Sequence, residues 1–212
     1  MITTKALASK VAAGDADAQF RMGYRMAFGR GKKHPHHWRH AVRYWRAAAE
    51  AGHPRAQFYL GTCYDFGHGV KKNFPLAMHW YKKAARSGHD MAQYNLGFSY
   101  RNGDGVPRSP RLAVKWLLRS ASQGNSDAQR DLGYCYHEGL GVRCNQTLAV
   151  NWYRKAARQG DAKACYNLAL CFKYGDGVRQ DGRSVRRWLK KAAAKGVGSN
   201  NSAGCRSPSK VV

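Results

Sequence analysis

The chain has 212 residues and is strongly basic, with 37 lysines and arginines against 12 aspartates and glutamates and a formal net charge of +25. This length is sufficient for one or two folded domains. No stretch approaches the roughly 20 consecutive apolar residues of a membrane span, which argues against a membrane-embedded class.

A pattern of 36 residues repeats along the chain. Copies begin at Gly52, Gly88, Gly124 and Gly160, and a looser copy with two extra residues in its central loop begins at Gly14. A fixed period of this size is typical of a solenoid, in which each unit packs only on its neighbours. We therefore expect one array over residues 14–196, with copies at 14–51, 52–87, 88–123, 124–159 and 160–196.

Two short segments flank this array. Residues 2–13 are predicted to form a helix, so that residues 1–13 would cap the first copy. Residues 197–212 are rich in glycine, serine and asparagine, and this composition predicts a flexible tail.

The first half of each copy predicts an α-helix, which we call helix A. Its residues are 16–28, 53–66, 90–101, 126–138 and 162–174. In the second copy, Ala56, Leu60, Gly61 and Tyr64 fall within one arc of such a helix. A glycine costs about 1 kcal/mol relative to alanine in a helix interior, so the recurrence of Gly61 indicates a close approach of helix A to the next helix. The last copy has Ala169 there, which is nearly as small.

The second half of each copy predicts another α-helix, helix B, over residues 38–51, 74–87, 110–123, 147–159 and 183–195. Ala77, Trp80, Tyr81 and Ala84 have the spacing of one apolar helix stripe. Suitable N-cap residues precede four of the copies, and the first copy has only His37, a weak cap. The four caps are Asn73, Ser109, Asn145 and Asp181. A glycine ends every helix B. Each copy is therefore an antiparallel helix hairpin that must stack on its neighbours to bury both stripes.

This pattern resembles the Sel-one-like repeat (SLR) family, a tetratricopeptide-like group. The shared residues run from an alanine through Leu-Gly, Tyr and Gly-x-Gly-Val to Ala-x-x-Trp-Tyr-x-Lys-Ala-Ala and a glycine, and residues 92–124 and 128–160 carry nearly all of them. The departures are Ala169, Phe172 and the irregular first loop. The resemblance implies an all-α, right-handed α-solenoid of about five hairpins and a role as a non-enzymatic scaffold for protein–protein interaction. It names no partner.

Positive charge is concentrated on helix B, which holds 18 lysines and arginines against Glu50, whereas helix A holds 7 against 6 acids. Helix B would line the convex surface of a tetratricopeptide-like stack. One interpretation is contact with a polyanion, either nucleic acid or an anionic surface. The alternative is a solvated face whose lysines complement the helix dipoles. The candidate contact residues are Lys82, Lys83, Arg86, Lys115, Arg119, Arg154, Lys155, Arg158, Arg186, Arg187, Lys190 and Lys191.

Aromatic residues recur on the opposite side of helix A from Leu60. Phe58 and Thr62 project there, and seven of the ten equivalent positions in the five copies are aromatic. Helix A would line a concave groove, where such rings could hold a protein segment. Burial between repeats is the alternative. The candidate partner-binding residues are Phe20, Tyr24, Phe58, Tyr94, Phe98, Arg130, Tyr134 and Tyr166.

The six cysteines suggest free thiols in a reducing compartment. Cys63, Cys135 and Cys171 occupy one position in different copies, and equivalent residues of adjacent copies are too far apart for a disulfide, which needs Cα atoms within about 7 Å. Residues 1–14 lack the apolar core of a signal peptide. We therefore expect a cytoplasmic protein, with signal-less export as an alternative.

No catalytic, cofactor or metal site is predicted. The histidines at 34, 36, 37 and 40 cluster in one loop, but no cysteine or carboxylate is near them in sequence, and a surface loop is the favoured interpretation. Some members of the family are linked to β-lactam binding or hydrolysis, which makes such an enzyme a distant alternative. The Ser-x-x-Lys string at 207–210 lies in the predicted tail without the accompanying motifs of that class. The Gly-x-Gly loops follow helices, not strands, so they do not predict a dinucleotide site.

Overall fold

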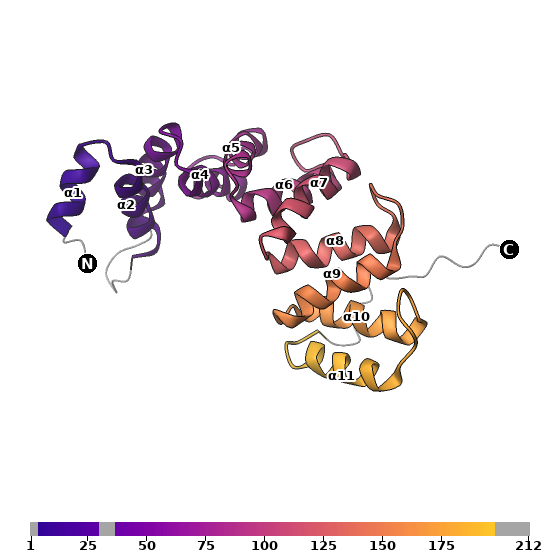
Figure 1. Ribbon diagram of the computed structural model, residues 1–212. Helices are drawn as coiled ribbons and strands as arrows, with labels where there is room; N and C mark the ends of the chain where they lie inside the picture. The colour runs from indigo at the N-terminus through magenta and orange to yellow at the C-terminus, as the bar shows by residue number, and fades with distance from the viewer. Residues whose placement is uncertain (1–3, 30–36, 198–212) are drawn as a thin grey trace. The chain divides into compact units, whose positions relative to one another are not determined.

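The computed structural model describes residues 4–29 and 37–197, and over these residues the chain forms α-helices without any strand (Figure 1). The helices are α1 (Thr4–Ala12), α2 (Ala16–Phe28), α3 (Trp38–Glu50), α4 (Pro54–Phe66), α5 (Phe74–Arg86), α6 (Asp90–Asn102), α7 (Pro110–Ser122), α8 (Ser126–Glu138), α9 (Gln146–Arg158), α10 (Ala162–Tyr174) and α11 (Gly182–Ala193). The even-numbered helices from α2 to α10 are the predicted A helices, and the odd-numbered ones from α3 to α11 are the B helices. The predicted all-α architecture of five helix hairpins is confirmed.

The chain divides into two compact units, residues 1–116 and 117–212, with the boundary inside α7. Unit 1 holds α1 to α6 and the first part of α7, and unit 2 holds the rest of α7 and α8 to α11. The helix predicted over 2–13 is present as α1, which contacts α2. The predicted tail, apart from Val197, lies outside the described residues.

Local capping sets where the helices begin. The side chains of Asn73, Asn145 and Asp181 accept backbone N–H bonds at the starts of α5, α9 and α11, as predicted, whereas His37 forms no side-chain cap bond. The A helices are capped too, by a feature that the sequence analysis did not consider. Their capping side chains are those of Asp15, His53, His89, Asn125 and Asp161.

Three of the hairpins close where a glycine of helix A meets a large ring of helix B. A Cβ atom added to Gly61 would lie 2.7 Å from Cδ1 of Tyr81, and one added to Gly23 would lie 2.6 Å from Cδ1 of Trp45. A Cβ atom added to Gly133 would likewise lie 2.7 Å from Cδ1 of Tyr153. The predicted close approach of the two helices is confirmed.

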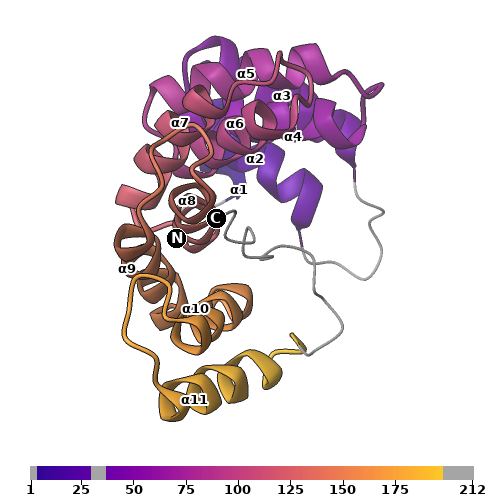
Figure 2. The same ribbon diagram turned by 90° about the vertical axis from the view of Figure 1, so that its right-hand side faces the viewer.

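Neighbouring hairpins stack within each unit, and Figures 1 and 2 both show α9, α10 and α11 as successive neighbours. Buried glutamines join the junctions before α4, α6 and α8: Gln57 Nε2 donates to the Ala49 carbonyl at 3.1 Å, and Gln129 Nε2 donates to that of Ala121 at the same distance. Before α10 the Cys165 thiol takes this position, 3.9 Å from the Ala157 carbonyl. The predicted apolar stripe of helix B is buried in α5, where Ala77 and Tyr81 are both 0% exposed, whereas Leu189 in α11 is 39% exposed. Among the described residues, the buried apolar side chains gather in clusters within each unit.

Candidate interaction surfaces

The predicted aromatic positions of helix A fall into two groups in unit 1. Phe20 is only 4% exposed and stacks on His53 with ring centroids 4.8 Å apart, so it belongs to the core between hairpins. Phe58 is half-buried and stacks on His89 at 4.6 Å. At these two positions the rings pack between repeats, as in the alternative interpretation.

The other group is open to solvent. Tyr24 is 43% exposed and Phe98 is 39% exposed, and Tyr94, half-buried, lies 6.5 Å from the ring of Phe98. The Arg101 guanidinium covers the Phe98 ring at 5.2 Å. These rings line one face of α2 and α6 and are accessible to a partner.

The corresponding positions in unit 2 are less open. Tyr134 and Tyr166 are half-buried. Arg130 is the centre of an ion-pair cluster, with Nη1 at 2.7 Å from Asp127 and 2.8 Å from Asp161, and Nη2 at 2.9 Å from Asp131. Burial would lower the pKa of Arg130, but Asp131, Asp161 and Asp127 outweigh it and raise the pKa above its ordinary value. Arg130 therefore joins two hairpins at the position where Phe20 and Phe58 use ring stacking.

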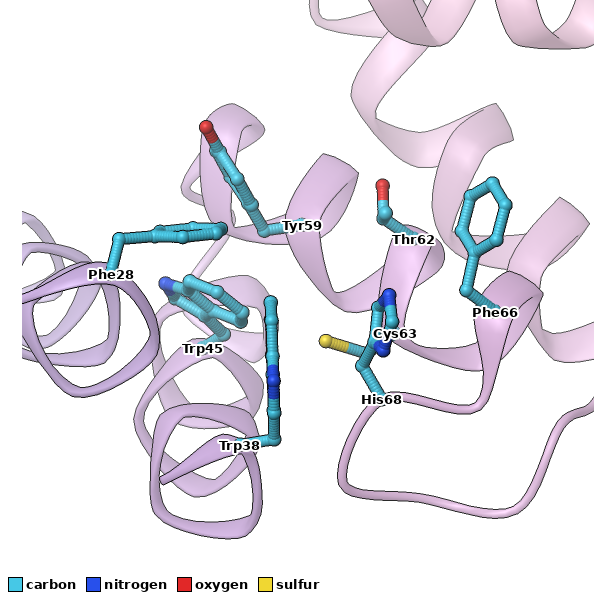
Figure 3. Close-up of a pocket in the computed structure, with 8 residues that line it drawn as sticks. All are labelled: Phe28, Trp38, Trp45, Tyr59, Thr62, Cys63, Phe66 and His68. Atoms are coloured by element: carbon cyan, nitrogen blue, oxygen red, sulfur yellow. The ribbon is translucent and has the colours of Figure 1, made fainter. Parts of the chain in front are cut away.

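Unit 1 contains an aromatic pocket that none of the predicted site residues lines (Figure 3). Its volume is about 330 Å³. The lining residues come from α2, α3, α4 and the loop after α4: they are Phe28, Trp38, Trp45, Tyr59, Thr62, Cys63, Phe66 and His68. The pocket therefore lies between the first two hairpins.

Ring contacts hold the walls of this pocket in place. Trp45 stacks on Tyr59 with centroids 5.0 Å apart, and Trp38 stacks on His68 at 4.5 Å. Phe28 meets Trp38 edge to face at 5.3 Å. In Figure 3, Phe28 and Trp45 lie at one end of the pocket and Thr62 and Phe66 at the other. Phe66 is 65% exposed, so the rim opens to solvent.

Two polar groups of the lining already have partners within the protein. Trp45 Nε1 donates to the Phe20 carbonyl at 3.2 Å, and the Thr62 hydroxyl donates to the Phe58 carbonyl at 3.1 Å. Burial raises the pKa of the Cys63 thiol to about 12, so the thiol is protonated at neutral pH. Burial, reinforced by the nearby Tyr24, also raises the pKa of Tyr59. The pocket therefore offers mainly apolar surface, with the His68 ring and the Tyr59 hydroxyl group among its lining.

The sequence held a signal for part of this pocket. Phe28 and Phe66 each come four residues after a predicted groove position, Tyr24 and Thr62, so they extend the same helix stripe by one turn. Nothing in the sequence pointed to Trp38, Tyr59 or His68. Their convergence depends on how the second hairpin packs against the first.

The predicted cations of helix B are on the surface. Ten of the twelve are exposed, and Lys82 and Arg154 are half-buried. Lys83 lies over the ring of Trp80 at 4.7 Å, and Lys155 lies over that of Trp152 at 4.0 Å. Within the described residues, Lys82, Lys83, Arg154 and Lys155 have no carboxylate within ion-pair distance. These side chains keep their charge available to a ligand.

Other reactive groups do not assemble into a site. Cys63, Cys135, Cys144, Cys165 and Cys171 are free thiols, as predicted, and Cys205 lies outside the described residues, as does the 207–210 string. In the clustered histidine loop the structure describes only His37 and His40, whose ring centroids are 5.8 Å apart. Where side chains are described, no three of the metal-binding type converge. Each described helix is too short or too polar to span a bilayer.

Comparison with known proteins identifies the family. A profile of the Sel1 repeat matches residues 16–53, 54–89, 90–125, 126–161 and 162–197. The chain belongs to the Sel1 repeat family. Sel1 repeat proteins are in general scaffolds for protein–protein interaction, and their solenoid fold is typically non-catalytic.

Solved Sel1 structures agree with this assignment. A Sel1 repeat protein from Oxalobacter formigenes is 32% identical with a TM-score of 0.81, and the match covers 92% of this chain and 74% of that one. A protective antigen of uropathogenic Escherichia coli is 31% identical with a TM-score of 0.76, and the match covers 93% of this Sel1 chain but only 50% of the antigen. A Sel1 repeat protein from Klebsiella pneumoniae shares the fold. It is 18% identical with a TM-score of 0.55, and the match covers 90% of this chain and 91% of that one. No curated protein sequence matches the chain.

Proposed function

We propose that this protein is a non-enzymatic adaptor that binds a polypeptide segment along the open aromatic face of its A helices in unit 1. The observation that carries the proposal is the exposure of large rings on α2 and α6, where Tyr24 is 43% and Phe98 is 39% exposed. Rings on an ordered helix lose little side-chain entropy on binding, which suits them to holding a segment of another protein. Tyr94 and the half-buried edge of Phe58 continue this face.

The test is a peptide selection followed by a matched comparison. Peptides selected from a random display library at high salt are measured by calorimetry against wild type and Tyr24→Ala/Phe98→Ala. We expect at least a tenfold loss of affinity in the variant with an unchanged helical circular dichroism spectrum. Tyr174→Ala, which removes an equally exposed ring from α10 in unit 2, is the control and should bind like wild type. Equal affinity in all three proteins would contradict the proposal.

A second candidate function is polyanion binding by the helix-B cations, whether nucleic acid or an anionic surface. It is supported by the exposure of Lys83 and Lys155 and by the lack of described carboxylates paired with them. The near absence of acids on helix B is not explained by helix-dipole effects alone.

Salt dependence tests this second candidate. Affinity for a DNA or RNA oligonucleotide should fall by orders of magnitude between about 50 mM and 200 mM salt if several phosphates are contacted. Arg154→Glu/Lys155→Glu should abolish binding. The control Lys163→Glu/Lys173→Glu makes the same change of charge on exposed positions of α10. No detectable binding at low salt, or equal losses in both variants, would count against a dedicated surface.

The proposal includes no catalytic role, no cofactor and no small-molecule substrate. It is supported by the pocket chemistry, since rings dominate the lining and its thiol, that of Cys63, is protonated at neutral pH. A cytoplasmic location is also part of the proposal, and the five free thiols are consistent with a reducing compartment.

A further inference from the structure

We infer that the aromatic pocket of unit 1 is an anchor site for one bulky apolar side chain, carried by a partner segment that is acidic around that side chain. The inference rests on the proposed function, because it specifies the chemistry of the segment that the adaptor binds. Apart from Thr62, its lining residues are not among the predicted groove positions, and the inference can fail while Tyr24 and Phe98 still bind peptides.

The size and lining of the pocket define the anchor. A volume of about 330 Å³ is at the lower limit of ligand sites, which suits one large side chain better than an extended ligand. The lining offers rings from Phe28, Trp38 and Phe66, while the Trp45 indole N–H and the Thr62 hydroxyl are already bonded within the protein. A charged or strongly polar group would lose its hydration there without a new partner, whereas an apolar side chain gains by burial.

The surface around the pocket defines the flanks of the segment. Helices α2, α3 and α4 and the loop 67–73 together hold eight lysines and arginines but only three carboxylates. Of these three, Asp17 pairs with Arg21 at 2.7 Å, and Asp65 accepts a hydrogen bond from the Tyr81 hydroxyl at 3.2 Å. Arg39 directly follows Trp38, Lys71 and Lys72 come three and four residues after His68, and all three are exposed. A partner with carboxylates next to its anchor would complement this charge and bind faster.

Segments 1–3, 30–36 and 198–212 of the given sequence contain no phenylalanine, tyrosine or tryptophan, so none of them offers an aromatic anchor. We place the anchor on a partner protein, because buried aromatic anchors dominate protein interfaces.

The probe is a nonapeptide with a central 5-fluorotryptophan flanked by glutamates. Its binding is measured by fluorine NMR as the full-length protein is added. Two matched peptides accompany it: one with lysines in place of the glutamates, and one with a single fluorinated alanine in place of the tryptophan. We expect the acidic tryptophan peptide to bind at least tenfold more tightly than either of the others. Failure of this peptide to bind, or equal binding of all three, would overturn the inference.

Two variants place the anchor in the pocket. Phe66→Ala removes an exposed wall of the pocket, and Thr62→Trp fills the pocket from α4. Each variant should bind the acidic tryptophan peptide with at least tenfold lower affinity. Tyr174→Ala, at the position of α10 equivalent to Phe66, should leave the affinity unchanged. Retained binding in both pocket variants would refute the anchor site. If the display-selected peptides still depend on Tyr24 and Phe98 in that case, the adaptor proposal stands alone.

Discussion

Arg130 Nη1 lies 2.8 Å from Oδ2 of Asp161, and this contact replaces in unit 2 the ring stack that Phe58 and His89 form in unit 1. Both pairs join a helix A to the N-cap of the next helix A. Asp161 accepts the Ala164 N–H and His89 accepts the Ala92 N–H, so each partner caps a helix while it binds the preceding hairpin. Two chemically different pairs thus serve the same junction.

Replacing the Arg130–Asp161 pair by the Phe–His pair of unit 1 should show that the two positions are coupled in their effect on stability. Arg130→Phe leaves Asp131 and Asp161 buried without the guanidinium charge, so we expect the free energy of unfolding of the protein to fall by about 3 kcal/mol at neutral pH. Arg130→Phe/Asp161→His recreates the pair of unit 1 and should recover part of this loss. Urea unfolding of both single variants and the double variant measures the coupling. Strictly additive effects would show that the two positions do not act as a pair.

Stability should decrease on acidification because of His89. Burial lowers the pKa of His89, an effect that Asp90 opposes and Arg55 reinforces. Since the folded-state pKa lies below the ordinary value of about 6.5, the stabilisation is complete above that pH and is lost as the pH falls through 6.5 toward the folded-state pKa. Urea midpoints measured between about pH 7.5 and 5.5 should fall less in His89→Asn, which keeps a capping side chain. An identical pH dependence in the two proteins would exclude this role.

Gly61→Ala should destabilise unit 1 although alanine favours helix by about 1 kcal/mol. The new Cβ would be 2.7 Å from Cδ1 of the buried Tyr81 ring, and such overpacking costs about 1–3 kcal/mol. Adding Tyr81→Leu should relieve the clash, because the fifth copy carries Ala169 and Leu189 at these two positions. Gly182→Ala, with nothing within 4 Å of its Cβ position, is the control and should be neutral or slightly stabilising. Thermal unfolding followed by circular dichroism compares the four proteins.

Gln129→Leu should weaken the junction of α8 with the preceding helix. The 5% exposed side chain donates to the Ala121 carbonyl and accepts from Gln159 Nε2 at 2.8 Å, and removal of a buried partner costs about 1–3 kcal/mol. Gln159→Leu removes this second bond and the bond that Gln159 Nε2 donates to the Gly124 carbonyl at 2.9 Å, but Gln159 is exposed, so the variant should cost less. The difference between the two variants in urea unfolding checks the assignment, and equal losses would contradict it.

Helical spacing predicts part of the candidate site. It puts Tyr24 and Phe98 on the same side of helix A as Phe20, because residues three and four apart share a side of a helix, but it leaves open whether that side is exposed or buried. Phe20 has the same spacing but is buried, since His53 of the next hairpin covers it. The aromatic pocket needed the packing of both hairpins, so Trp38 and His68, 30 residues apart, gave no local signal.

The sequence by itself determined the helices, their ends and their pairing into hairpins. These features depend on interactions within a single copy, from the Asn73 cap to the contact of Gly61 with Tyr81, 20 residues later, and such interactions recur along the chain. Only the tertiary structure decided which side chains of successive hairpins meet: Trp38 with His68, Phe58 with His89, and Arg130 with Asp161. Each of these contacts joins residues about 30 apart, and the stacking register of whole hairpins, which no local pattern encodes, brings them together.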